Sequence, residues 1–287
     1  MNRRHRILVA AVAVVVTGLQ VVTAQPSAAL PPLTLQTATS GVISPGGVKS
    51  ATALCAADQV VVGGGGEVVG EPPHTTVLTA LEPHATEGAT PPRFVVRARA
   101  LAYPKFQEAW QLRAYALCAP AASMQPYLIV KSTSSTSQLT FRAGTARCPG
   151  GRVAYSAGAT TSNTSGFGLQ LVRTSGPLDI ARATVRAFGT AVPDPWQLST
   201  YAVCGPRKDG IVAAARVAGG PLVGVSCPEG TQQIHGAGGG LGLSDGGTNW
   251  IRTLRPTNVQ SPGSMTVRMS LNPGYQVVAH TTCATRT

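Results

Sequence analysis

The stretch that decides the fold lies in the middle of the chain, where CPGGRVAYSAGA (residues 148–159) is followed, after a variable segment, by WQLSTYAVC (residues 196–204). The first part starts at a Cys, continues into a Pro-Gly-Gly turn and then enters a run of small residues. The second part has the pattern of a short strand that ends in another Cys. Searching for further copies of these two parts shows that the chain repeats itself.

Two more copies flank the central one. Each copy runs between two Cys residues, and the three pairs are Cys55 and Cys118, Cys148 and Cys204, and Cys227 and Cys283. A closing strand that starts with an aromatic residue, at the same distance before the second Cys, recurs at residues 110–112, 196–198 and 275–277. A middle Val-Arg strand recurs at residues 96–98, 185–187 and 267–269. Because several independent anchors keep the same order, the sequence predicts a threefold internal repeat.

Composition and patterning favour strands throughout the mature chain. Only 12% of the residues are charged and 5% are aromatic, a mixture that suits short strands joined by turns. Residues 94–100 and 110–118 alternate in character as half-buried strands do, and residues 127–132 and 138–147 form a leading pair in the second copy. We predict an all-β fold with about five or six strands per unit. It is built either as one β-prism-like body or as three small β-sandwiches in tandem.

Six Cys residues at regular places in an exported chain favour disulfide bonds. Two pairings preserve the repeat: within units (55–118, 148–204 and 227–283) or between neighbours (118–148, 204–227 and 55–283). We favour the first, because its spacings are the more uniform. Each such bridge closes a loop of about 60 residues and stabilises the fold by roughly 4 kcal/mol in the chain-entropy model. No Cys-x-x-Cys or Cys/His spacing is present, so we predict no metal site.

The first 24 residues read as a secretory signal peptide. Arg3, Arg4 and Arg6 form its basic region, residues 7–22 its apolar stretch, and residues 22–24 end it at small side chains. The apolar run is shorter than the ~20 residues that a spanning helix needs. We therefore expect a secreted, extracellular protein with no transmembrane segment after cleavage. Its repeat units are placed at 25–120, 121–206 and 207–287.

The net charge limits the classes of partner. It is +12 for the whole chain, and removing the three Arg of the signal leaves +9. A basic exported protein suits a cell-envelope polysaccharide or another anionic polymer. The cations are scattered, with no run of five or more, so no specific nucleic-acid partner is expected. Abundant Arg, Ala, Gly, Val and Pro are also what a GC-rich bacterial genome supplies.

The cores CPGGRV, AGA and WQLSTYAVC within residues 148–204, with their partners in the other units, resemble a repeat found in uncharacterised secreted proteins of actinobacteria. This resemblance covers nearly the whole mature chain and implies a secreted bacterial protein without an assigned activity. The layout of a Cys, a Gly-rich strand, a polar loop and a closing strand ending in Cys is also similar to vitelline membrane outer layer protein, which implies a β-prism. The units here are longer, with extra leading strands. Neither resemblance supplies catalytic residues.

Several stretches invite functional readings that their context does not support. The Gly-rich runs 63–66 and 236–241 lack the strand-to-helix context and the Lys of a phosphate loop, so we interpret them as close sheet packing or a bulge. His280 stands where Tyr115 and Tyr201 stand in the other units, and we interpret it as structural. A loop peculiar to unit 1, interpreted as solvated, carries His74, His84, Glu71, Glu82 and Glu87. We find no catalytic constellation and predict no cofactor.

Aromatic and Arg residues are the remaining binding candidates. The repetition of Trp110, Trp196 and Tyr275 argues for core positions. Trp250 has no aromatic counterpart and is our candidate for an exposed binding aromatic. The candidate binding cations are Arg97, Arg186 and Arg268, which the repeat places at one position per unit. The simpler interpretation is that each lies on the wet face of its strand, alternating with a buried Val.

We therefore expect a secreted, non-enzymatic binding or structural protein of the extracellular space or cell envelope. A carbohydrate or an anionic polymer is the ligand class to test. The alternative is a secreted hydrolase whose site the sequence does not reveal. An inhibitor or toxin-like binder is a third class, because variable Pro-rich loops would suit it.

Overall fold

The computed structural model describes residues 32–41, 47–70, 76–85, 90–100, 109–163, 166–175, 178–188, 194–208, 210–229, 233–241, 249–259, 263–270 and 275–284. The predicted signal peptide lies outside these residues. The described part is almost entirely strand, with one short 3-10 helix, η1 (Ala121–Met124), between units 1 and 2. The predicted all-β class is confirmed.

Each unit contributes six strands in the same order. Unit 1 holds β1 (Thr34–Thr39), β2 (Val48–Leu54), β3 (Gln59–Val69), β4 (Thr76–His84), β5 (Arg93–Ala100) and β6 (Gln111–Pro120). Unit 2 holds β7 (Leu128–Thr133), β8 (Phe141–Arg147), β9 (Val153–Thr161), β10 (Phe167–Ser175), β11 (Ile180–Ala187) and β12 (Leu198–Gly205). Unit 3 holds β13 (Val212–Gly219), β14 (Leu222–Ser226), β15 (Gln233–Leu241), β16 (Ile251–Asn258), β17 (Ser264–Met269) and β18 (Gln276–Ala284).

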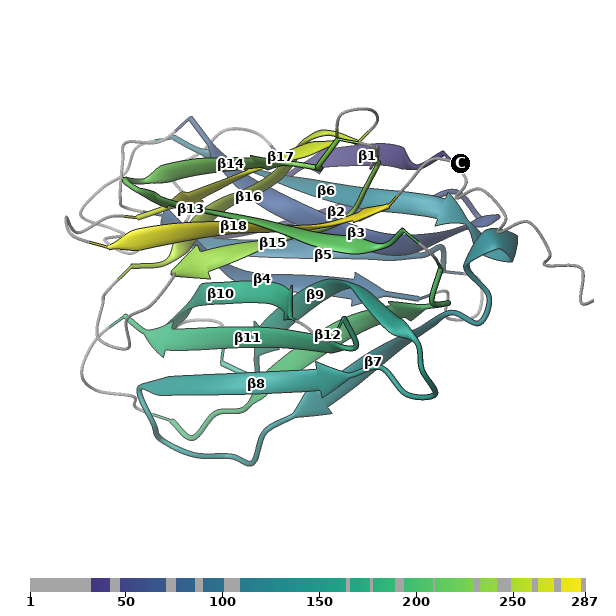
Figure 1. Ribbon diagram of the computed structural model, residues 1–287. Helices are drawn as coiled ribbons and strands as arrows, with labels where there is room; N and C mark the ends of the chain where they lie inside the picture. Colours follow the sequence, from purple (N-terminus) through teal and green to yellow (C-terminus); the bar gives the residue numbers. More distant parts are fainter. Residues whose placement is uncertain are drawn as a thin grey trace, which may run out of the picture.

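The strands form three six-stranded sheets, and every sheet is shared by two units. Their strand orders are β1-β6-β3-β16-β17-β14, β13-β18-β15-β10-β11-β8 and β2-β5-β4-β9-β12-β7. The second of these sheets runs down the front of the molecule in Figure 1, from β13 to β8. In each sheet the third strand of one unit pairs with the fourth strand of another. We call these three junctions seams and name them by their strands: β3–β16, β9–β4 and β15–β10.

Within a unit, the two three-stranded halves pack face to face. In unit 1, β2 and β5 lie against β6, and β3 lies against β4 and β5. The corresponding strands of units 2 and 3 are in contact in the same way. Each unit is therefore a small β-sandwich, and the seams close three sandwiches into a ring. The predicted threefold organisation is confirmed, and the three sandwiches share sheets in one closed body, so they do not form a tandem array of separate domains.

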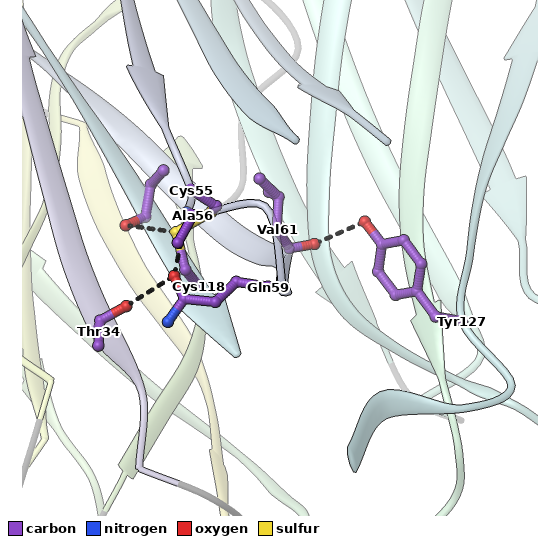
Figure 2. Close-up of a disulfide and its surroundings, with 8 residues drawn as sticks. Thr34, Cys55, Ala56, Gln59, Val61, Cys118 and Tyr127 are labelled. Atoms are coloured by element: carbon purple, nitrogen blue, oxygen red, sulfur yellow. Dashed lines mark hydrogen bonds between the residues drawn. A yellow bond between two sulfur atoms is a disulfide. The ribbon is translucent and has the colours of Figure 1, made fainter. Parts of the chain in front are cut away.

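The disulfides join the two halves of each sandwich. Cys55–Cys118, Cys148–Cys204 and Cys227–Cys283 are formed, which confirms the within-unit pairing. The first Cys of each pair follows the second strand of its unit, and the second Cys lies in the sixth strand. Since those two strands belong to different sheets, the three bridges link the three sheets pairwise. Figure 2 shows the first bridge beside Gln59. The Oε1 atom of Gln59 accepts hydrogen bonds from the backbone N–H of Ala56 and from the hydroxyl of Thr34.

Small residues occur where a strand of the neighbouring unit passes over the Gly-rich strand. Gly65, Gly158 and Gly238 pair with Tyr115, Tyr201 and His280 in the three units. A Cβ on Gly158 would lie 2.5 Å from the carbonyl oxygen of Leu81, in the fourth strand of unit 1. One on Gly238 would lie 2.8 Å from the carbonyl oxygen of Val172. A register shift also interrupts each Gly-rich strand. Both parts of the prediction, close packing and a bulge, are therefore confirmed.

The middle Val-Arg strand of unit 2 is offset from the other two. Arg97 pairs with Ser50, and Arg268 pairs with Leu222, each five residues before the first Cys of its unit. Arg186 instead pairs with Phe141, seven residues before Cys148. The residue that structurally matches Arg97 in unit 2 is Thr184, so the expectation of three Arg at one position was wrong. The sequence alignment matched the Val-Arg-Ala string at residues 185–187. Relative to the first Cys of its unit, this string pairs with the second strand two residues away from where its counterparts pair in units 1 and 3.

Trp110 and Trp196 are core residues, as predicted. Their exposed fractions are 2% and 0%. The Trp196 ring packs 4.0 Å, centroid to centroid, from the Phe167 ring, and its indole N–H donates to the carbonyl oxygen of Leu139 at 2.7 Å. A cation stacks on each indole: Lys49 on Trp110 at 4.7 Å and Arg142 on Trp196 at 5.5 Å. These cations come from the second strand of each sandwich, so the Trp anchors that strand at the end opposite the disulfide.

Candidate functional site

Polar side chains gather at the three seams, on the outer face of each sheet. Each seam takes one residue from the Gly-rich third strand, one from the neighbour's fourth strand and one from the closing strand. These three positions hold Glu67, Arg255 and Tyr115 at the β3–β16 seam, Thr160, Glu82 and Tyr201 at the β9–β4 seam, and Gly240, Arg173 and His280 at the β15–β10 seam.

A carboxylate organises the β3–β16 seam. The hydroxyl of Tyr115 donates to Glu67 Oε2 at 2.5 Å, and Arg255 Nη1 donates to Glu67 Oε1 at 3.0 Å. Arg113 lies 3.4 Å from the same carboxylate. Burial, followed by the bond to Glu67, raises the pKa of Tyr115. Glu67 therefore links unit 1 to unit 3. Its charged carboxylate accepts one hydrogen bond from the neutral Tyr115 hydroxyl of unit 1 and one from the Arg255 guanidinium of unit 3.

A second carboxylate organises the β9–β4 seam from the other strand. Glu82 forms an ion pair with Arg97 and lies 3.6 Å from His84 Nε2. Burial alone would raise the pKa of Glu82, but the neighbouring His84 and the charge of Arg97 together lower it. Burial and the nearby Glu82 raise the pKa of Tyr201 to about 12. The carboxylate of unit 1 therefore stays ionised and lies close to Tyr201 of unit 2.

The β15–β10 seam has no carboxylate among the described residues. Arg173 stands where Glu82 stands, and Gly240 stands where Glu67 stands. His280 is 7% exposed, and burial together with the charge of Arg173 lowers its pKa to about 4. Beside it, the hydroxyls of Thr174 and Thr282 lie 3.2 Å apart. This seam is held by neutral contacts, and no carboxylate of the described residues pairs with the Arg173 guanidinium.

A second set of polar contacts joins the fourth strands, where a register shift displaces one residue in each. These residues are Thr79, Gln170 and Arg252. Arg252 Nε donates to the carbonyl oxygen of Thr76 in unit 1 at 3.1 Å, and Gln170 Nε2 donates to that of Asn249 in unit 3 at 3.1 Å. Burial and nearby Arg268 lower the pKa of Arg252 to about 10. Thr79 is too short to make the third contact, and these buried contacts are structural.

The outer face of β10, β11 and β8 carries several Arg residues. Arg173 and Arg182 lie directly opposite each other on β10 and β11, and Arg186 lies further along β11 on the same face. Arg147 at the end of β8 pairs with Asp179 at 3.3 Å. Arg182 is exposed, and Arg173 and Arg186 are half-buried. The three strands lie at the lower front of the molecule in Figure 1.

The predicted binding cations lie on three different sheets. Arg97, Arg186 and Arg268 belong to β5, β11 and β17. Arg97 is committed to Glu82, while Arg268 is exposed. Their Val neighbours, Val96, Val185 and Val267, are fully buried, as the alternation predicts. The structure therefore does not bring these Arg together as one basic feature, and any binding role for them stays a prediction.

Trp250 was expected to be exposed, and this was wrong: it is 6% exposed. Its ring packs edge-on against Phe188 at 5.3 Å, and its indole N–H donates to the carbonyl oxygen of Arg186 at 3.3 Å. A Cβ on Gly168 of unit 2 would lie 2.5 Å from the indole Cδ1. Trp250 thus fills the space above a glycine of the neighbouring unit. Its lack of an aromatic counterpart reflects this pairing with Gly168.

The predicted solvated loop of unit 1 is partly a strand. Glu82 and His84 belong to β4, and Glu82 is buried. His74, Glu71 and Glu87 lie outside the described residues. Among the residues that the structure describes, no group of three His, Cys, Asp or Glu side chains could hold a metal ion. Across the same residues, no helix is long and apolar enough to cross a membrane.

Sequence reasoning missed Glu67 and Arg173, and it placed Glu82 in a solvated loop although Glu82 lies buried in β4. The repeat position of Glu67 holds Thr160 and Gly240 in the other units, so aligning the units gives no signal for it. The fourth-strand position holds Glu82, Arg173 and Arg255, so a charge recurs there but its sign does not. The recurring Tyr115, Tyr201 and His280 were the available clue, because a polar ring repeated in a closing strand needs a partner when it is buried.

Comparisons with known proteins found no family model that matches this chain and no matching curated protein.

Proposed function

We propose that the protein is a secreted, non-enzymatic binding protein that presents a rigid cationic surface to an anionic polymer of the extracellular space or cell envelope. The observation that carries this proposal is the position of the charged side chains, with carboxylates inside the seams and Arg residues on the outer faces. Glu67 and Glu82, the two glutamates within the described sheets, are consumed inside the seams. The outer sheet faces keep exposed Arg residues such as Arg182 and Arg268. Guanidinium groups on a rigid surface suit bidentate binding of carboxylate, sulfate or phosphate.

The fold supports a role in binding through its rigidity. Three disulfides link the sheets pairwise, and three seams close the ring. A surface that is already ordered loses little entropy when it binds a flexible polymer. Secretion supports the same role, because it would bring the protein into contact with acidic envelope polymers.

The test is a titration of the mature protein with polygalacturonate, with neutral dextran as the control. Calorimetry at low salt should detect binding to the acidic polymer alone, and the affinity should fall steeply as salt is added. Absence of binding to polygalacturonate, dextran sulfate and teichoic acid at low salt would refute the proposal. Release of reducing ends from the polymer would favour the hydrolase alternative instead.

A further inference from the structure

The molecule contains two internal examples of how its seams hold an anion. At the β3–β16 seam a carboxylate from the third strand is bound by a Tyr hydroxyl and two Arg side chains. At the β9–β4 seam a carboxylate from the fourth strand is bound by Arg97 and His84. The carboxylate comes from a different strand in each case, yet it lies beside the equivalent Tyr of a closing strand, Tyr115 or Tyr201. A negative group at this place is thus a recurrent part of the design.

The β15–β10 seam has the cations without the anion. Arg173 lies directly across the strand pair from Arg182, whereas the matching pairs are Glu82 with Val95 and Arg255 with Thr266. Like charges directly opposite in a sheet are destabilising. Arg173 Nε is buried and has no hydrogen-bond partner, and neither Arg forms an ion pair with a described residue. Among the described residues nothing compensates this pair, so a bound anion would stabilise it.

The backbone fixes this cationic pair in place. Arg173 lies at the point of β10 where this strand passes over Gly238, because a Cβ on that glycine would lie 3.1 Å from the Arg173 Cβ. Gly238 pairs with His280, whose lowered pKa keeps it neutral near pH 7 and free of positive charge. The guanidiniums of Arg173 and Arg182 therefore share one side of the seam, with a neutral imidazole beside them in the place of Tyr115.

We propose that the β15–β10 seam is a carboxylate-binding site, in which Arg173 and Arg182 bind a uronate group of an acidic polysaccharide. This inference deepens the proposed function by naming its site and its ligand group. Carboxylate is the group favoured, because it is the one that the other two seams supply from Glu67 and Glu82. Arg186 lies four residues beyond Arg182 on the same face, or about 13 Å along the strand. A linear polyuronate lying along β11 would offer it a further carboxylate.

The decisive experiment compares two double variants that remove the same charge. R173Q/R182Q empties the site, and R207Q/R216Q removes two exposed Arg residues that belong to no proposed binding surface, Arg207 after β12 and Arg216 on the edge strand β13. Binding of polygalacturonate to each is measured by calorimetry at one low salt concentration. The site variant should lose affinity at least tenfold, and the control should change no more than about twofold to threefold. Equal losses would overturn the site and leave the proposed function intact. Absence of wild-type binding to any polyanion would refute the proposed function itself.

A charge reversal gives a second, independent readout. Arg173→Glu restores the residue type of Glu82 and places a carboxylate opposite Arg182. The variant should melt at a higher temperature than the wild type and should no longer bind polygalacturonate, because an internal group now occupies the site. R182Q alone changes one exposed side chain and serves as the variant that keeps its fold. A lower melting temperature for Arg173→Glu with binding retained, or wild-type preference for dextran sulfate over polygalacturonate, would overturn the carboxylate assignment.

Discussion

Units 1 and 2 differ from unit 3 in chemistry more than in backbone. All three fold into the same six strands and carry the same disulfide. Units 1 and 2 close with a buried Trp under a cation, and their closing strands carry Tyr115 and Tyr201 beside a carboxylate. Unit 3 has a half-buried Tyr275 and a buried His280 that faces Arg173. The comparison teaches that seam geometry is kept in every copy while the residues that neutralise it are not.

The largest expected effect tests the Trp anchors that unit 3 lacks. Trp196→Ala should lower the free energy of unfolding by about 3–5 kcal/mol, because a fully buried indole leaves a cavity beside Phe167. Tyr275→Ala, at the matching position of unit 3, should cost less than about 1 kcal/mol. Urea unfolding followed by far-ultraviolet circular dichroism, with the disulfides intact, measures both. Equal losses would mean that unit 3 is anchored in the same way as the others.

The second effect is a pH dependence particular to unit 3. The pKa of His280 is lowered from 6.5 to about 4, so the unfolded chain takes up a proton in that interval and the folded chain does not. Stability is therefore full above pH 6.5 and should fall by roughly 2–3 kcal/mol as the pH drops towards 4. Arg173 is the charged group that opposes the protonated ring, and Gly238 and Thr282 beside it are uncharged.

His280→Tyr restores the residue of units 1 and 2 and should flatten the stability profile between pH 6.5 and 4. Denaturant midpoints measured across this interval provide the check. Protonation of Glu82, whose pKa is lowered, destabilises the fold at lower pH than His280 does. The stabilising contribution of Glu82 is present above the usual Glu pKa of 4.5 and is lost below it. An unchanged profile in the Tyr variant would show that another group controls the acid response.

The third effect concerns the seam glycines, which all units share. Gly158→Ala should destabilise the protein by about 2 kcal/mol, because the new methyl would meet the backbone of Leu81 and the ring of Pro83. Gly219→Ala is the control, since nothing lies within 4 Å of its added Cβ. Thermal melting of both variants compares them. Similar melting temperatures would mean that β4 shifts at little cost to accommodate the added methyl group, and that the β9–β4 seam is not tightly packed at Gly158.

How much of this could be read from the sequence depends on whether a residue type recurs. The Cys pairs, the Gly runs and the Trp at 110 and 196 recur, and the strands, bridges and core positions followed from them. The seams did not follow, because pairing between β3 and β16 joins residues almost two hundred positions apart without any matching pattern. Trp250 was misplaced because its partner is Gly168, and a missing side chain leaves no pattern to find. Arg186 was misaligned because a Val-Arg-Ala string recurs two residues away from its structural equivalent.

The smallest effect tests the cation that covers each Trp, which unit 3 replaces with Pro221. Lys49 Nζ lies 4.7 Å from the centre of the Trp110 ring and donates to the Trp110 carbonyl oxygen at 2.6 Å. Lys49→Met keeps the apolar stem, so its loss of about 1 kcal/mol would report the ammonium contacts alone. Lys131→Met is the matched control, because Lys131 is exposed and lies 5.7 Å from the Tyr201 ring. It should cost less than about 0.5 kcal/mol. If the Lys49 variant is as stable as the wild type, the indole alone anchors the second strand, and the difference between units 1 and 3 reduces to ring size.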